Sequence, residues 1–195
     1  YPRMLPPAGI PMNGTQAGVT WRIERKQIPQ RTIPMDNALE QLEGKLSSEI
    51  SSHQNLAKAL EIALSGFKDH LTAKGISNPM LSDFQINSVA VFIKQNLSTD
   101  EEHQLISAGT GSGKTFGFQL GVISLVILNR LNGINFNTEF LMVYPRVALA
   151  LDQHSSFNEL LQSVNNLLVQ RSLKPIIAIL DAGGQLKNQI AAPFF

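Results

Sequence analysis

The feature that most constrains this chain is a glycine-rich stretch, SAGTGSGKTFGF, which directly precedes a long apolar segment. Glycine has no Cβ, so successive backbone N–H groups can turn inward and approach an anion closely. A helix that follows adds its unpaired N-terminal donors and the positive end of its dipole. The stretch therefore predicts a loop that binds phosphate and leads into a helix.

The residues from Ala108 to Thr115 fit the phosphate-binding loop of nucleotide-binding proteins, although alanine replaces the first glycine of the usual pattern. The pattern predicts that Lys114 reaches the β and γ phosphates and that the Thr115 hydroxyl holds Mg²⁺. These two residues are the expected catalytic groups, and ATP and Mg²⁺ are the expected ligands. The nucleotide-binding residues expected in the loop are Gly109, Thr110, Gly111, Ser112, Gly113, Lys114 and Thr115.

The chain divides into three parts by composition and periodicity. Residues 1–35 are rich in proline and contain one strand-like alternation, which predicts an extended segment with a short strand. Residues 36–78 carry leucine and isoleucine at three- and four-residue spacing, which predicts a helical extension. The remaining part, residues 79–195, begins with a further helix for which Ser82 is the expected cap.

Beyond Ser98 the pattern alternates between strands and helices. Short apolar runs predict strands at 103–107, 139–144 and 175–180, and longer segments predict helices at 114–131 and 147–170. This alternation is typical of an α/β fold in which a parallel sheet is flanked by helices. Ligands of such folds bind beyond the carboxyl ends of the strands, where the glycine-rich loop falls.

Composition excludes several classes of function. Sixteen basic and fifteen acidic residues leave a net charge of +1, so any binding of nucleic acid must be local. No cysteine is present, and the four histidines are far apart, which excludes thiolate metal sites and disfavours histidine ones. The longest apolar run, residues 120–128, is too short to span a bilayer and predicts a core helix. We expect a cytoplasmic protein.

The loop sequence AGTGSGKT resembles motif I of the superfamily-two helicases of the DEAD/DEAH-box type. In the same order along the chain, Gln85 in DFQINSVAVF resembles the glutamine of the family's Q motif, which reads the adenine edge. The stretch YPRVALALDQ resembles motif Ia, which contacts the nucleic-acid backbone, and LDAGGQLKNQ resembles the family's glycine doublet. The resemblance implies contacts with nucleic acid at Pro145, Arg146, Ala148, Gly183 and Gly184.

The resemblance implies the first part of an incomplete RecA-like lobe, a P-loop NTPase fold, preceded by a mainly helical extension. The acidic DEAD/DEAH motif and the arginine fingers do not occur in the sequence, so we expect them elsewhere in a longer parent, with a second RecA-like lobe as partner. The chain alone is expected to be inactive. The wording of motif Ia is similar to that of large bacterial DNA-repair and phage-defence helicases, which favours DNA over RNA. Residues 1–80 are a possible site for a protein partner.

Two alternatives stay open at this point. If Asp181 were the Mg²⁺ ligand at the end of a Walker B strand, the chain would be a P-loop ATPase without a nucleic-acid substrate. If the lobe were degenerate, the chain would be a helicase-like binding module that recruits a partner. Phe67 is also open to two interpretations, as the ring that stacks on the adenine or, as we favour, as a core residue.

Overall fold

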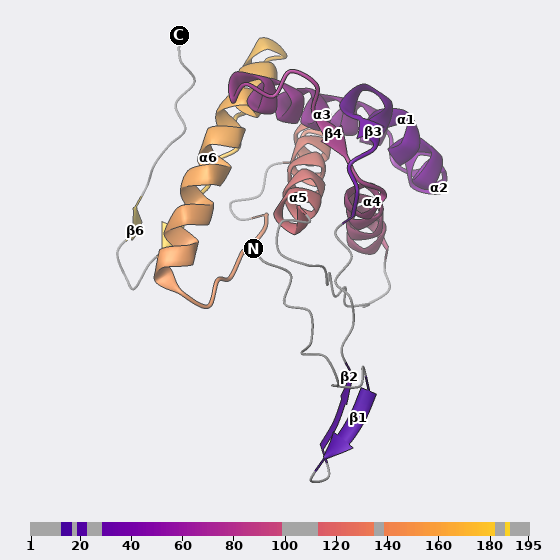
Figure 1. The fold of residues 1–195 in the computed structure, drawn as a ribbon. Helices are drawn as coiled ribbons and strands as arrows, with labels where there is room; N and C mark the ends of the chain where they lie inside the picture. Colours follow the sequence, from indigo (N-terminus) through magenta and orange to yellow (C-terminus); the bar gives the residue numbers. More distant parts are fainter. Residues whose placement is uncertain are drawn as a thin grey trace.

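The structure of the chain is a computed structural model that describes residues 13–16, 19–22, 29–98, 113–134, 139–181 and 186–187. Six helices dominate the described part of the chain, and Figure 1 shows their arrangement. They are α1 (Met35–Lys45), α2 (Ser47–Ser52), α3 (Leu56–Ala73), α4 (Asp83–Leu97), α5 (Lys114–Leu131) and α6 (Val147–Gln170).

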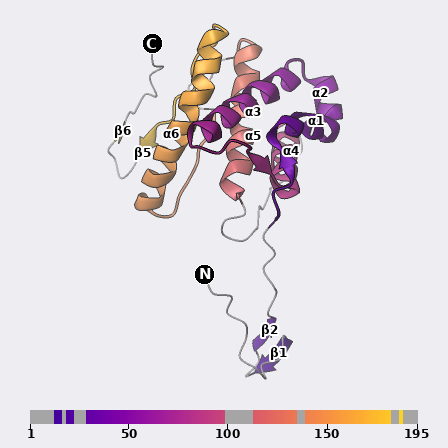
Figure 2. The ribbon, with the colours of Figure 1, turned by 45° about the horizontal axis from the view of Figure 1, so that its top comes forward.

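Helix α3 contacts helices from both the N-terminal and the C-terminal parts of the chain. It packs against both α5 and α6, and α4 packs against the other side of α5 (Figures 1 and 2). Helix α1 contacts α3 and α4. The helical extension therefore shares one hydrophobic core with the helix that follows the glycine-rich loop. The side chains at the centre of this core include Leu42, Leu60, Ile86, Ile93, Leu120, Ile123, Ile127 and Leu161, all under 2% exposed.

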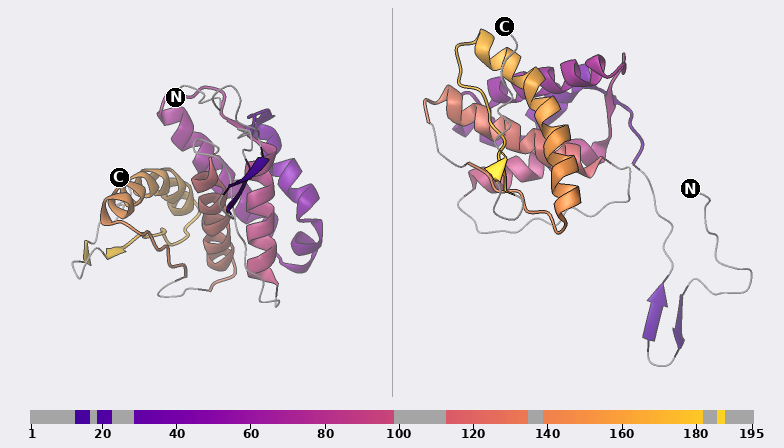
Figure 3. Two further views of the ribbon diagram at one scale, coloured as in Figure 1. Left: turned by 60° about the horizontal axis from the view of Figure 1, so that its bottom comes forward. Right: turned by 90° about the vertical axis from the view of Figure 1, so that its left-hand side faces the viewer.

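The strands of the described residues form three separate antiparallel pairs. β1 (Asn13–Gln16) pairs with β2 (Val19–Arg22), and the right-hand view of Figure 3 shows this hairpin away from the helices. β3 (Ile33–Pro34) pairs with β4 (Met80–Leu81), which ties the start of α1 to the start of α4. β5 (Leu180–Asp181) pairs with β6 (Leu186–Lys187).

The sequence predicted a parallel sheet, and this part of the prediction is not confirmed in the described residues. Residues 139–144 and 175–179 form no strand, and the expected strand at 103–107 lies outside the described part. The backbone groups of a parallel strand are normally satisfied by neighbouring strands, and no such neighbour is present beside these two segments in the described residues. The two segments keep the alternation of a strand nevertheless, because Leu141 and Val143 are over 80% exposed while Phe140 and Met142 are half-buried.

The predicted helices are confirmed. α5 and α6 cover the predicted segments 114–131 and 147–170. α2 and α3 lie within the predicted helical extension, 36–78, and α1 begins one residue before it. Helix α3 ends two residues before Gly75, whose φ of +84° suits a residue without Cβ. Ser82 caps α4, as the sequence predicted.

Candidate nucleotide-binding site

The start of α5 carries the described part of the glycine-rich loop. Gly113 is the N-cap residue of the helix, with φ 80° and ψ 29°, a left-handed conformation that favours glycine. Lys114 and Thr115 form the first turn, and both are half-buried. No side chain caps this helix. Gly109, Thr110, Gly111 and Ser112 lie outside the described residues, so their expected roles stay predictions.

A bound phosphate fits the described end of this loop. Backbone N–H groups in the first turn of a helix have no intrahelical partner, and a glycine cap supplies no side-chain acceptor for them. The 18-residue helix also places the positive end of its dipole at this point. A helix start with a glycine cap is therefore a favourable place for an anion.

Gln85 lies directly against the last glycine of the loop. A Cβ built on Gly113 would stand 2.4 Å from Gln85 Nε2, so the two residues touch only because Gly113 has no side chain. The Gln85 Oε1 atom accepts hydrogen bonds from Ser82 N–H at 2.9 Å and from Ser82 Oγ at 3.2 Å. In return, Gln85 N–H donates to Ser82 Oγ at 3.3 Å, which completes a capping box.

This capping box fixes the direction of the Gln85 carboxamide. Gln85 is 2% exposed and Ser82 1% exposed, so both polar side chains are buried and hydrogen-bonded. The carbonyl end is engaged by Ser82, which leaves the Nε2 end facing the loop. The structure therefore brings together two parts of the predicted nucleotide site, Gln85 and the start of α5.

Phe67 is a core residue. Its side chain is 2% exposed, and its ring meets the Phe116 ring edge-on, with centroids 4.5 Å apart and an interplanar angle of 69°. The contact joins α3 to the first turn of α5. The core interpretation of Phe67 is thus confirmed.

The residues that resemble motif Ia lie on the surface at the start of α6. Pro145, Arg146 and Ala148 are all exposed, and Arg146 is the N-cap residue of the 24-residue helix. Tyr144, just before them, is half-buried, and burial raises the pKa of its hydroxyl above the usual 10.0. The three candidate residues are thus free of the core and share one helix start, separate from that of α5.

The second candidate nucleic-acid turn is largely outside the described residues. Gly183 and Gly184 fall there, and only their flanks are described. Asp181, the alternative Mg²⁺ ligand, is exposed and lies opposite Leu186 in the antiparallel pair β5–β6. In the described part of the chain no three His, Cys, Asp or Glu side chains come close enough to hold a metal ion.

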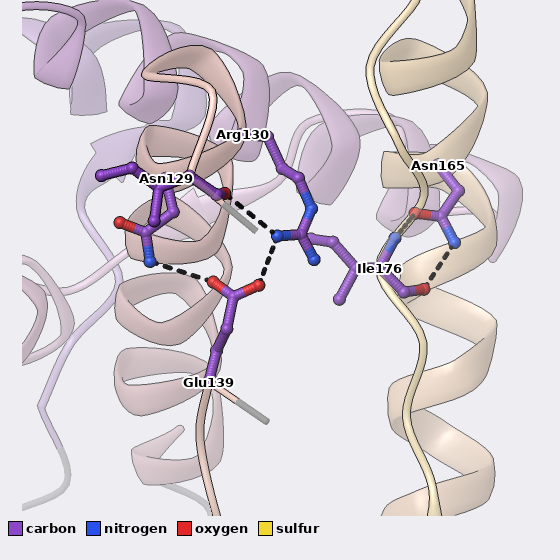
Figure 4. Close-up of polar contacts among 6 residues, drawn as sticks. Asn129, Arg130, Glu139, Asn165 and Ile176 are labelled. Carbon is purple, nitrogen blue, oxygen red and sulfur yellow. Dashed lines mark hydrogen bonds and ion pairs between the residues drawn. The ribbon is translucent and has the colours of Figure 1, made fainter. Parts of the chain in front are cut away.

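Three features of the site region were missed by sequence reasoning. Gly113, Gly117 and Gly121 recur every four residues, and this spacing was the available signal for a close helix contact. Glu139 forms a nearly buried ion pair with Arg130 and accepts a hydrogen bond from Asn129 Nδ2 at 3.0 Å (Figure 4). These contacts fasten the start of the segment 139–144 to the end of α5. No pattern in the sequence predicted them.

The third missed contact fastens the other irregular segment. Asn165 of α6 is 1% exposed, and its Nδ2 donates to the Ile176 carbonyl at 2.9 Å. The Ile176 N–H donates to Asn165 Oδ1 at 2.8 Å, so one carboxamide satisfies both backbone groups of Ile176 (Figure 4). The pair holds residues 175–179 against α6.

A loop that ends in Gly-Lys-Thr at a helix start is typical of proteins that bind nucleoside triphosphates. The model of the DEAD/DEAH box helicase family matches residues 84–189, just over half of the chain, from the start of α4 past β6. The chain belongs to the DEAD/DEAH box helicase family. No curated protein and no solved structure matched it.

Family membership sets the general activity. DEAD/DEAH box helicases are ATP-dependent enzymes that act on nucleic acid and use ATP with a divalent metal ion, typically Mg²⁺. None of the helices in the described part of the chain is long and apolar enough to cross a membrane.

Proposed function

We propose that this chain supplies the ATP-binding side of an ATP-dependent helicase or translocase, as the first part of its first RecA-like lobe. The observation that carries the proposal is the left-handed Gly113 cap of α5, followed at once by Lys114 and Thr115, within the segment that the family model matches. The second RecA-like lobe would lie in a longer parent protein in the cytoplasm.

In this proposal each residue of the site has a defined task. The Lys114 ammonium binds the β and γ phosphates, and the Thr115 hydroxyl holds Mg²⁺. Gln85 Nε2 donates to the adenine, since its Oε1 is engaged by Ser82. Lys114 and Thr115 would hold the ATP phosphates and Mg²⁺, and hydrolysis of the ATP in the complete protein would supply the energy of movement along the nucleic acid.

The nucleic acid would cross the surface formed by Pro145, Arg146 and Ala148, together with the turn at Gly183 and Gly184. Support comes from the exposure of the first three residues at the start of α6, where a helix N-terminus and a guanidinium both favour a phosphate. Contacts of this kind position a strand without reading its sequence. We propose DNA as the substrate, in bacterial DNA repair or phage defence.

The test of the nucleotide site is the variant Lys114→Ala in the complete protein. We expect ATP turnover to fall by about 10²–10³-fold, because a preorganised positive donor is lost from the phosphates. Lys94→Ala is the matched control, since Lys94 is an exposed lysine on the neighbouring helix α4. If ATP turnover is unchanged in Lys114→Ala, the loop does not take part in ATP hydrolysis.

The test of the nucleic-acid surface is the salt dependence of DNA binding. Arg146→Ala should lower the slope of log affinity against log salt by about 0.7–0.9, which corresponds to one phosphate contact. Arg171→Ala is the control, because Arg171 is exposed at the opposite end of α6. Equal slopes for the wild type and Arg146→Ala would mean that the nucleic acid does not contact Arg146. If Arg146→Ala lowers the slope more for RNA than for DNA, RNA would replace DNA as the proposed substrate.

A further inference from the structure

Helices α4 and α5 run parallel and touch along a row of glycines. Three glycines spaced four residues apart, the N-cap residue of α5 and two within the helix, each face a residue of α4, and both series advance in the same direction. The facing pairs are Gly113 with Gln85, Gly117 with Ser88, and Gly121 with Phe92. Because four residues make about one helical turn, the row forms a single smooth face on α5.

The middle pair leaves no room for a methyl group. A Cβ built on Gly117 would stand 2.9 Å from the Ser88 Cβ and 3.6 Å from the Ser88 Oγ. Ser88 is 5% exposed, and its Oγ donates to the Phe84 carbonyl at 2.8 Å. The Cβ of Ser88 is fixed to its own helix backbone, so only a movement of one helix against the other can relieve such a contact.

The third pair is close but adaptable. A Cβ on Gly121 would stand 2.5 Å from the Phe92 ring atom Cδ1. The Phe92 ring is half-buried and lies tilted against Phe140, with ring centroids 6.1 Å apart. A ring can turn about its side-chain bonds, so this contact limits the helix distance less strictly than the contact of Gly117 with Ser88.

We propose that Gly117 is a positioning residue for nucleotide binding, which sets the separation of α4 and α5 through its contact with Ser88. The inference rests on the proposed function, because the first turn of α5 carries Lys114 and Thr115 and the first turn of α4 carries Gln85. Gly117 lies one turn beyond Gly113, and its N–H donates to the Gly113 carbonyl oxygen at 3.4 Å. A Cβ at position 117 would stand 3.9 Å from the Gln85 carbonyl oxygen, which is ordinary contact, so Ser88 alone supplies the steric limit. The effect of Gly117 passes through the two helix backbones.

The size of the effect follows from the distances. Ordinary carbon–carbon contact lies near 3.5–4.0 Å, so a methyl at position 117 pushes the helices apart by about half to one ångström. Gln85 then moves away from Gly113, so the distance between Gln85 and the phosphate-binding residues Lys114 and Thr115 changes. Displacements of about 1 Å in a binding site can cost about 10²-fold in activity.

The experiment measures the affinity of the complete protein for the non-hydrolysable analogue AMP-PNP with Mg²⁺, together with thermal unfolding. We expect Gly117→Ala to raise the Kd by about 10–100-fold at a temperature where the variant is folded. The double variant Ser88→Gly/Gly117→Ala removes the atom that the new methyl meets and should return the Kd to within about threefold of the wild type. Gly121→Ala should raise the Kd by only about threefold, because the Phe92 ring can turn aside. If Gly117→Ala does not fold, the double variant should recover both folding and binding, and a double variant that stays unfolded contradicts the inference.

Gly66→Ala is the matched control for a loss of stability alone. A Cβ at Gly66 would stand 2.6 Å from the Val164 Cγ2 atom, so it forces a similar contact between α3 and α6, away from the α4–α5 contact. We expect a lower melting temperature and an unchanged Kd. Gly44→Ala meets nothing within 4 Å on α1 and should leave both quantities near the wild type.

The outcomes separate this inference from the proposed function. A complete wild-type protein that does not bind AMP-PNP overturns the proposed function and this inference with it. If the wild type binds, the inference fails when Gly117→Ala binds equally well, when Ser88→Gly gives no rescue, or when Gly66→Ala loses as much affinity. Loss with Gly117→Ala, rescue by Ser88→Gly and an unchanged Kd for Gly66→Ala support it.

Discussion

The contact between α4 and α5 and the two segments beside α6 differ in how their backbones are satisfied. At the helix contact, every backbone group beyond the first and last turns bonds within its own helix, and side chains such as Ile86 and Ile93 are fully buried. In the segments 139–144 and 175–179, strand-like alternation occurs without strand pairing, and Leu141 is 84% exposed.

The difference shows which part of this fold can form from local information. A helix completes its hydrogen bonds with residues four positions away, so it needs only one apolar surface to pack against. An extended segment needs a neighbour along its edge. At Ile176 the Asn165 carboxamide takes that place, because it bonds both backbone groups. The segment 139–144 is held in another way, through the Glu139 carboxylate, which contacts the Arg130 and Asn129 side chains.

The largest effect on this comparison is expected from Glu139→Ala. The side chains of Arg130 and Glu139 are 12% and 8% exposed, so the variant leaves a nearly buried guanidinium without its carboxylate. We expect the free energy of unfolding to fall by about 3 kcal/mol, measured by urea denaturation.

The control for Glu139→Ala is Lys68→Ala, which breaks the ion pair between Lys68 and Asp36. The side chains of that pair are 42% and 71% exposed, and exposed pairs contribute less than about 1 kcal/mol. If the two variants lose the same free energy of unfolding, the Glu139 contact does not fasten the segment 139–144.

A smaller effect is expected from Asn165→Ala. The variant removes both hydrogen bonds to Ile176 and leaves a backbone N–H and carbonyl of a buried residue without partners. The expected loss is about 2 kcal/mol in the free energy of unfolding, with faster hydrogen exchange at the Ile176 amide. Asn166→Ala, at an exposed position of the same helix, should change stability by less than about 0.5 kcal/mol. Unchanged exchange at Ile176 would contradict the role given to Asn165.

The helices could be predicted from the sequence because their signals are local. The apolar run after Gly113 predicted α5, and the helical periodicity of the segment 147–170 predicted α6. Ser82 followed three residues later by Gln85 is the spacing of a capping box, and the structure forms one. The family resemblance assigned Gln85 to the nucleotide site as the residue that reads the adenine edge, and the contact of Gln85 with Gly113 is consistent with a place in that site.

The remaining features depend on distant pairs that a single sequence does not reveal. Apolar runs at 139–144 and 175–180 have the composition of strands, but composition does not say which strand lies beside them. The partners of Glu139 and Ile176 come from other elements, and so does the Ser88 that limits position 117. The family could be predicted from the resemblance of the motifs. The close contact between α4 and α5 is seen only in the three-dimensional structure.

The two-point bond between Asn165 and Ile176 has a consequence for how this protein can associate with others. Exposed strand edges are templates on which other chains add strands, and proteins commonly block them. Both backbone groups of Ile176 are already occupied, and two residues further on the Ala178 carbonyl oxygen lies 3.3 Å from the His154 ring nitrogen Nε2. Along this side the segment is closed to intermolecular sheet growth, so a neighbouring strand has access only from the side that faces away from α6.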